Sequence, residues 1–127
     1  MNYLIDTHIL IWYAEGNPQL STHTISEIRK PSNRIYISHA TFWEMTIKLT
    51  LGKLKFSTPI AQFNELITQY NFHILSIDFE HYNVLETLSL HHNDPFDRML
   101  IAQAIAEDMT LITQDTKFAS YESPLYP

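Results

Sequence analysis

Four acidic residues, Asp6, Glu44, Asp97 and Asp115, are the side chains of this sequence best suited to joint chemistry. Asp6 lies in the apolar run YLIDTHILIW, where burying a lone carboxylate is expensive unless it is paired or bound to a metal. Carboxylates that gather repel one another and are stable together only if cations lie among them. Oxygen ligands without cysteine suit Mg²⁺ or Mn²⁺. If the four acids meet, they predict a site for one or two such ions.

Each acid also has a simpler explanation. Asp6 could cap a helix that begins at the next residue, and Asp94, followed by a proline, is a strong helix cap. Glu44 could pair with Lys48 one helical turn later, and Asp115 could belong to a turn. Asp97 then adds a second acid to the helical turn that Asp94 caps, which is more than capping needs. Taken jointly, the simpler explanations account for the set less well than a shared site does.

The elements that must position these acids alternate between strand and helix. Apolar and β-branched runs predict strands at 2–5, 34–38, 72–77 and 110–113. Helical spacing, caps and breakers predict helices at 7–15, 21–30, 38–51, 58–70, from 78 onwards, 94–108 and 116–121. This alternation predicts an α/β fold of βαβ units, with a parallel sheet covered on both faces.

Ligands of such sheets bind beyond the carboxyl ends of the strands. Asp6 directly follows the first predicted strand, and Asp115 follows the last one by two residues. Glu44 and Asp97 lie in helices expected to begin near the same edge. The topology therefore predicts that residues spread over the whole chain meet at one edge of the sheet.

Composition limits the class of protein. The 127 residues fit one domain over 1–127, and 45% hydrophobic residues with 17% charged residues are typical of a folded core. No cysteine is present, no apolar run is long enough to span a membrane, and the start of the chain lacks the pattern of a secretory signal. We therefore expect a cytoplasmic protein. The net charge of −6 weakly disfavours a broad nucleic-acid-binding face.

Other catalytic centres find little support. The seven histidines show no zinc-binding spacing, and the adjacent His91 and His92 are expected to be loop residues. No Gly-x-Ser-x-Gly elbow suggests a serine hydrolase, and with two glycines no Gly-rich phosphate loop is formed.

Four segments together resemble the PIN-domain ribonucleases, and more closely the VapC-type toxins of bacterial toxin–antitoxin pairs. They are YLIDTHILIWY, ISHATFWEMTIKLTLGKL, HHNDPFDRMLIAQA and LITQDTKF, in that order and over nearly the whole chain. The resemblance implies a three-layer α/β/α sandwich with a short parallel sheet and a Mg²⁺- or Mn²⁺-dependent endoribonuclease. It also implies a small antitoxin that blocks the active site, and a homodimer.

The resemblance assigns the metal site to Asp6, Glu44, Asp97 and the more variable Asp115. Asp94 belongs to the DPFDR form of the motif, and its direct contact with metal is in doubt.

Around this metal site, Thr7 and Thr113 are expected to orient carboxylates, and Lys48, Arg98 and Lys117 are candidates to contact RNA phosphates. Trp12, Phe42 and Trp43 could serve a dimer or antitoxin surface, although we expect them to pack in the core.

Three alternatives remain open at this stage. A PIN-like nuclease could act on DNA or structured RNA outside a toxin–antitoxin pair. A non-catalytic partner-binding module would use the acids as helix caps only. A signalling receiver domain has a similar length, but it needs an acid pair after the first strand, where this chain has Asp6 followed by Thr7.

Overall fold

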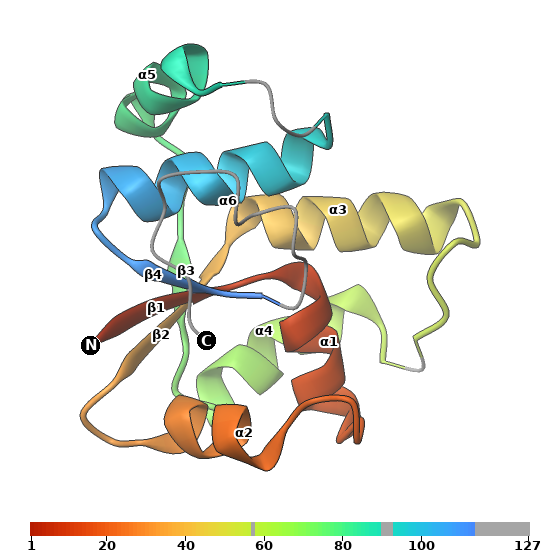
Figure 1. The fold of residues 1–127 in the computed structure, drawn as a ribbon. Coiled ribbons are helices and arrows are strands. Elements are labelled where there is room, and N and C mark those ends of the chain that lie inside the picture. Colours follow the sequence, from red (N-terminus) through yellow and green to blue (C-terminus); the bar gives the residue numbers. More distant parts are fainter. Residues whose placement is uncertain (57, 90–92, 114–127) are drawn as a thin grey trace.

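A computed structural model describes residues 1–56, 58–89 and 93–113. Four strands form one parallel sheet in the order β3-β2-β1-β4 (Figure 1). They are β1 (Asn2–Ile5), β2 (Arg34–Ser38), β3 (His73–Leu75) and β4 (Thr110–Ile112). The predicted strand 72–77 is shorter in the structure, because β2 ends at Ser38, opposite Leu75, and offers no further partner.

Six helices cover the two faces of the sheet (Figure 1). One layer holds α1 (Thr7–Glu15), α2 (Thr22–Arg29) and α4 (Ile60–Gln69). The other holds α3 (His39–Thr50), α5 (Phe79–Thr87) and α6 (Pro95–Ala106). The three-layer α/β/α arrangement predicted from the resemblance is therefore confirmed. The short helix predicted at 116–121 lies outside the described residues.

The core divides into two halves because neighbouring strand residues point to opposite faces. Tyr3 and Ile5 of β1 pack with the α1, α2 and α4 layer, in a cluster that includes Phe63. Leu4 and Leu111 face the other way, where they pack against Leu100, Ile101 and Ala104 of α6. A strand buried on both faces needs apolar or β-branched residues at nearly every position, as YLI of β1 and TLI of β4 have.

Side-chain caps fix where most helices begin, as the sequence predicts. Ser21, Ser38, Asp78 and Asp94 each accept a backbone N–H in the first turn of the following helix. The start of α4 differs from the prediction, because Pro59 has extended backbone angles and stands just before the helix instead of in its first position.

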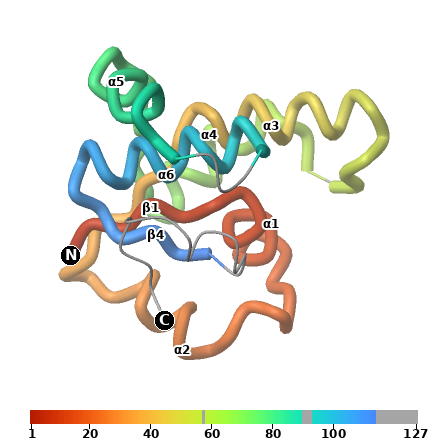
Figure 2. Tube along the Cα trace, turned by 45° about the horizontal axis from the view of Figure 1, so that its top comes forward, coloured from red at the N-terminus to blue at the C-terminus, as the bar shows by residue number. Residues whose placement is uncertain are grey.

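The helices that carry the predicted acids meet at the carboxyl edge of the sheet. Figure 2 shows α3 and α6 side by side, with α1 beginning beneath them, and α3 is in contact with both α6 and α1. Asp6 caps α1, Glu44 lies in the middle of α3, and Asp97 lies in the first turn of α6.

Candidate active site

Asp6 is a buried carboxylate at the end of β1, with 4% of its surface exposed. Its Oδ1 accepts the backbone N–H of Ile9 at 2.9 Å, so Asp6 does cap α1, as the simpler explanation holds. Its Oδ2 accepts the hydroxyl of Thr113, just beyond β4. Burial raises the pKa of Asp6 despite these two hydrogen bonds, and the nearby charge of Glu44 adds to the rise. The cap therefore does not remove the cost of charge at this position.

Glu44 is a second buried carboxylate, with 4% exposure. The hydroxyl of Thr7 donates to Oε1 at 2.5 Å, and the ammonium of Lys48 lies 2.7 Å from Oε2. The pair with Lys48 that the sequence allowed is therefore formed. The acid of this pair is buried, whereas the simpler explanation placed the pair on an exposed helix face. The hydrogen bond from Thr7 to Glu44 joins α1 to α3.

Asp94 and Asp97 bring the start of α6 to the same place. Oδ1 of Asp94 accepts the backbone N–H groups of Phe96 at 2.9 Å and of Asp97 at 3.1 Å, so Asp94 is the predicted cap. The negative charges of Asp94 and Asp97 both favour the protonated form of Lys48. Burial alone would lower the pKa of Lys48, but its hydrogen bond with Glu44 and the charges of Glu44, Asp94 and Asp97 outweigh burial and raise it. The ammonium group is therefore in contact with Glu44 of α3, and the charges at the start of α6 also favour its protonated form.

Thr41 is a site neighbour that sequence reasoning missed. It is 1% exposed, and among the described residues its Oγ1 is the buried side-chain polar atom without a hydrogen-bond partner. Thr41, Glu44 and Lys48 share one face of α3 because they are three and four residues apart. A hydroxyl residue three positions before Glu44, on the same face of the helix, is the signal that could have identified it.

The side chains at this edge have the donor chemistry of a hard divalent cation. Asp6, Glu44 and Asp97 carry carboxylates, and Thr41, three residues before Glu44 in α3, adds a hydroxyl without a hydrogen-bond partner. Among the described residues, the ligand oxygens of Asp6, Glu44 and Asp97 do not all lie within 4.8 Å of one another. Oxygen-only donors of this kind favour Mg²⁺ or Mn²⁺ over zinc.

The remaining predicted residues have different positions. Asp115 and Lys117 lie outside the described residues, as do His91 and His92. Arg98 is half-buried and donates to the backbone oxygens of Ser89 at 3.0 Å and Leu88 at 3.3 Å, which joins α6 to the end of α5.

The expectation that Trp43 packs in the core is wrong. Its side chain is 63% exposed and contacts Phe96 of α6 edge to face, with ring centroids 5.3 Å apart. Trp12 and Phe42 are partly buried and do pack against the core.

A different group of metal-ligand side chains, Asp78, His81 and Glu107, gathers among the described residues away from the predicted acids. His81 is fully buried, and both of its ring nitrogens have protein partners. Nδ1 accepts the backbone N–H of Asp78 at 3.1 Å, and Nε2 lies 2.8 Å from Glu107 Oε2. These bonds account for the group as a structural contact between α5 and α6.

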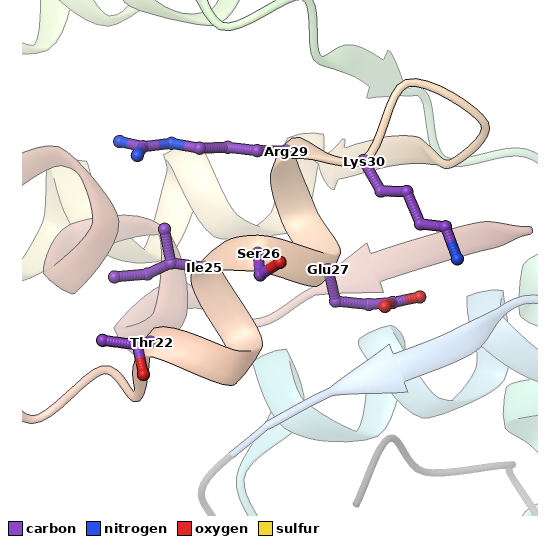
Figure 3. A pocket seen from close by; sticks show the side chains of 6 residues that line it. All are labelled: Thr22, Ile25, Ser26, Glu27, Arg29 and Lys30. Atoms are coloured by element: carbon purple, nitrogen blue, oxygen red, sulfur yellow. The ribbon is translucent and has the colours of Figure 1, made fainter.

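A hollow formed by described residues also lies elsewhere. It has a volume of about 830 Å³ and is open to solvent along α2 (Figure 3). Its described lining is Thr22, Ile25, Ser26, Glu27, Arg29 and Lys30, none of which belongs to the predicted site. The site is therefore assigned from the buried acids and their partners, not from a hollow.

Comparison with known proteins identifies the family of the chain. The PIN domain family model matches residues 3–123. The chain belongs to the PIN domain family. That match takes in Asp6, Glu44, Asp97 and Asp115, so all four predicted acids of this PIN domain lie within the family's span.

Solved structures share the fold at low sequence identity. VapBC2 from Rickettsia felis, bound to a DNA fragment from its promoter, matches with a TM-score of 0.75 and 18% identity, over 99% of this chain and 98% of that one. A toxin–antitoxin complex from Klebsiella pneumoniae matches with a TM-score of 0.66 and 22% identity, over 98% of this chain and 96% of that one. VapBC-5 from Mycobacterium tuberculosis, a member of a toxin–antitoxin family, matches with a TM-score of 0.61 and 20% identity, over 98% of this chain and 95% of that one.

No curated protein matches this PIN domain by sequence. Among its described residues, no helix has the length and apolar character needed to cross a membrane.

Proposed function

We propose that this PIN domain is a Mg²⁺- or Mn²⁺-dependent endoribonuclease. The observation that carries the proposal is the pair of buried carboxylates, Asp6 and Glu44, at the carboxyl edge of the sheet. Every oxygen of this pair accepts a hydrogen bond from the protein, so both groups are held in one orientation. Burying two acids together is unfavourable for folding alone, and it is reasonable where a cation is to be bound.

Asp6, Glu44 and Asp97 would hold one or two ions, with Asp115 as the fourth ligand. A bound cation would supply a Lewis acid that activates water and neutralises charge at the scissile phosphate. Thr7 and Thr113 keep the carboxylates of Glu44 and Asp6 in place through their hydroxyl groups.

The reaction is hydrolysis of an RNA phosphodiester. The oxygen of water forms a new bond to phosphorus, and the bond from phosphorus to the 3′ oxygen breaks. The products are a 5′-phosphate and a 3′-hydroxyl, and the 2′-hydroxyl takes no part. Lys48, Arg98 and Lys117 remain the proposed phosphate contacts of the substrate strand.

The biological role that we propose is the toxin of a cytoplasmic toxin–antitoxin pair. The matching Klebsiella pneumoniae structure is a toxin–antitoxin complex, and it covers 98% of this chain. A small antitoxin protein that covers the acids would keep such a nuclease inactive.

A homodimer is also proposed. Phe79 and Tyr82 stand side by side on α5, with ring centroids 6.2 Å apart and with 83% and 49% of their surfaces exposed. An exposed pair of aromatic rings such as Phe79 and Tyr82 is typical of a protein–protein contact, and a second copy of the chain is the proposed partner.

The test is cleavage of a labelled mixture of tRNA and mRNA by the wild type and by Asp97→Asn, each with Mg²⁺ or Mn²⁺. EDTA is the control for the cation, and single-stranded DNA is the control for the nucleic acid. We expect the wild type to cut RNA and both the variant and the EDTA reaction to be inactive. Equal cleavage by wild type and Asp97→Asn would refute the site, and preferential cleavage of DNA would favour the alternative substrate.

A further inference from the structure

We infer that the ammonium group of Lys48 is a built-in cation of the acidic site, which must leave Glu44 before a divalent cation binds there at full strength. This inference rests on the proposed function, because it assumes that the acids bind a metal. It makes Lys48 a competitor of the metal for Glu44, a role distinct from contact with RNA.

The hydrogen bonds of Glu44 show which partner has to move. Oε1 accepts from the uncharged hydroxyl of Thr7, which can keep its bond while the carboxylate binds a metal. Oε2 faces the ammonium of Lys48 at 2.7 Å. A divalent cation on the same carboxylate would lie next to that positive charge, and the repulsion between them would be strong in a partly buried site.

The surroundings of Lys48 distinguish this pair from an ordinary contact between helix neighbours. The Glu44 side chain is 5% exposed, and acids of a second helix, Asp94 and Asp97, also act on the ammonium. An ordinary surface pair contributes little because water solvates both groups. Here Lys48 is paired with a buried acid of α3, and the negative charges at the start of α6 also favour its charged form. Positive charge beside these acids is what a bound metal would also supply.

Lys48 is also placed so that it can withdraw. Its side chain is 35% exposed, whereas that of Glu44 is nearly closed off. A long flexible side chain can turn its charged end into water with little change in the helix that carries it. The metal-free site is therefore stabilised by a cation that the protein itself supplies and can release.

Competition and simple structural support predict opposite effects on metal affinity. If Lys48 competes, its removal leaves the acids free for the metal, and the affinity for Mn²⁺ rises. If Lys48 only holds Glu44 in position, its removal lets Glu44 shift, and the affinity falls. The sign of the change decides between them.

The experiment is calorimetric titration of Mn²⁺ into the full chain of the wild type, Lys48→Met, Lys48→Arg and Lys53→Met. Lys53 is an exposed lysine just beyond α3 and serves as the matched control. We expect Lys48→Met to bind Mn²⁺ about tenfold more tightly than the wild type, because one repelling charge is gone. Lys48→Arg, which keeps the charge, and Lys53→Met should bind as the wild type does.

A second measurement uses the wild type alone and so does not depend on the folding of a variant. Reductive methylation followed by mass spectrometry reports how accessible each lysine amine is. We expect Mn²⁺ to increase the labelling of Lys48 at least about threefold relative to that of Lys53, because the released ammonium is no longer held by Glu44. Unchanged labelling of Lys48 in protein saturated with Mn²⁺ overturns the inference.

The outcomes separate this inference from the proposed function. If the wild type binds Mn²⁺ but Lys48→Met binds it equally or more weakly, competition by Lys48 is refuted while the metal site stands. If the wild type binds no Mn²⁺, the metal site and the inference fail together.

Discussion

The hydroxyl of Thr7 lies 2.5 Å from Oε1 of Glu44, 37 positions further along the chain. This contact joins the first residue of α1 to the middle of α3. It holds one oxygen of the buried Glu44 carboxylate in place. Thr7 also directly follows Asp6, the second buried acid. Both buried acids of the site are therefore held through one short segment, Asp6-Thr7.

Replacing Thr7 with valine keeps the shape of the side chain and removes the hydroxyl. Glu44 then loses the donor at Oε1, and we expect Mn²⁺ affinity and RNA cleavage to fall about 10- to 100-fold. Thr7→Ser should restore most of both. The control is Thr46→Val on the exposed face of α3, where the hydroxyl bonds only to the backbone oxygen of Phe42. Cleavage by Thr7→Val at the wild-type rate would show that this hydroxyl does not position the acid.

The pKa of Asp6 makes the stability of the metal-free protein depend on pH. Because burial raises the folded-state pKa above the ordinary 3.8, folded Asp6 holds a proton that the unfolded chain releases first. Its stabilising contribution is complete below the unfolded value and is lost as the pH rises through the folded value. Asp6→Asn, which can still cap α1, has no such loss.

We therefore expect the Tm of Asp6→Asn in EDTA to exceed that of the wild type. The difference in Tm should grow as the pH rises from the unfolded-state pKa of Asp6 through its folded-state pKa. Mn²⁺ should raise the Tm of the wild type and not that of the variant. Melting curves with EDTA and with Mn²⁺ test both statements. A variant that is less stable than the wild type at neutral pH would contradict them.

Asp94 and Asp97 should respond differently to the loss of charge. Asp94 caps α6 through two backbone N–H groups, which asparagine can also accept. We expect Asp94→Asn to keep the stability and most of the cleavage, and Asp94→Ala to lose about 1 kcal/mol of stability. Asp97→Asn should keep the fold and lose cleavage. An inactive Asp94→Asn that still folds would assign Asp94 to the metal.

Gln103 links three elements beneath the site. Its Oε1 accepts the hydroxyl of buried Ser38 at 2.5 Å, and its Nε2 lies 3.4 Å from Nδ1 of His81. Gln103→Leu would leave the Ser38 hydroxyl buried without this partner, so we expect a loss of about 1–3 kcal/mol in the free energy of unfolding. Denaturant titration measures it, with the exposed Gln62→Leu on α4 as the control. A loss no larger than that of Gln62→Leu would mean that the network adds little.

The exposed rings of α5 provide a test of the proposed dimer. Phe79→Lys places a charge in the proposed contact between two copies, where its burial would be costly. We expect size-exclusion chromatography with light scattering to show a dimer for the wild type and a monomer for Phe79→Lys. Leu51→Lys is the control, because Leu51 is also exposed, at 61%, but lies beyond α3. A monomeric wild type would refute this contact.

Local patterns in the sequence determine most of the framework. The runs NYLI and RIYIS form strands as predicted, because a strand buried on both faces needs apolar or β-branched residues at nearly every position. Ser21, Ser38, Asp78 and Asp94 mark the helix starts because a cap requires only a short polar side chain next to its own helix. The order of these elements along the chain also places Asp6 at the carboxyl edge.

Only the tertiary structure decides the contacts between distant segments. The sequence predicts that Thr7 orients a carboxylate, but the packing of α1 against α3 decides that its partner is Glu44. The burial of Gln103 beside His81 likewise depends on how two helices pack. The same packing leaves Trp43 exposed, although its large apolar ring favoured the core. It also turns the pair of Lys48 and Glu44, which spacing alone allows, into a cation held among acids of two helices. Spacing along one helix determines which side chains can form a pair. Burial and the side chains of the neighbouring helix determine how strong the interaction of that pair is and what chemistry it allows.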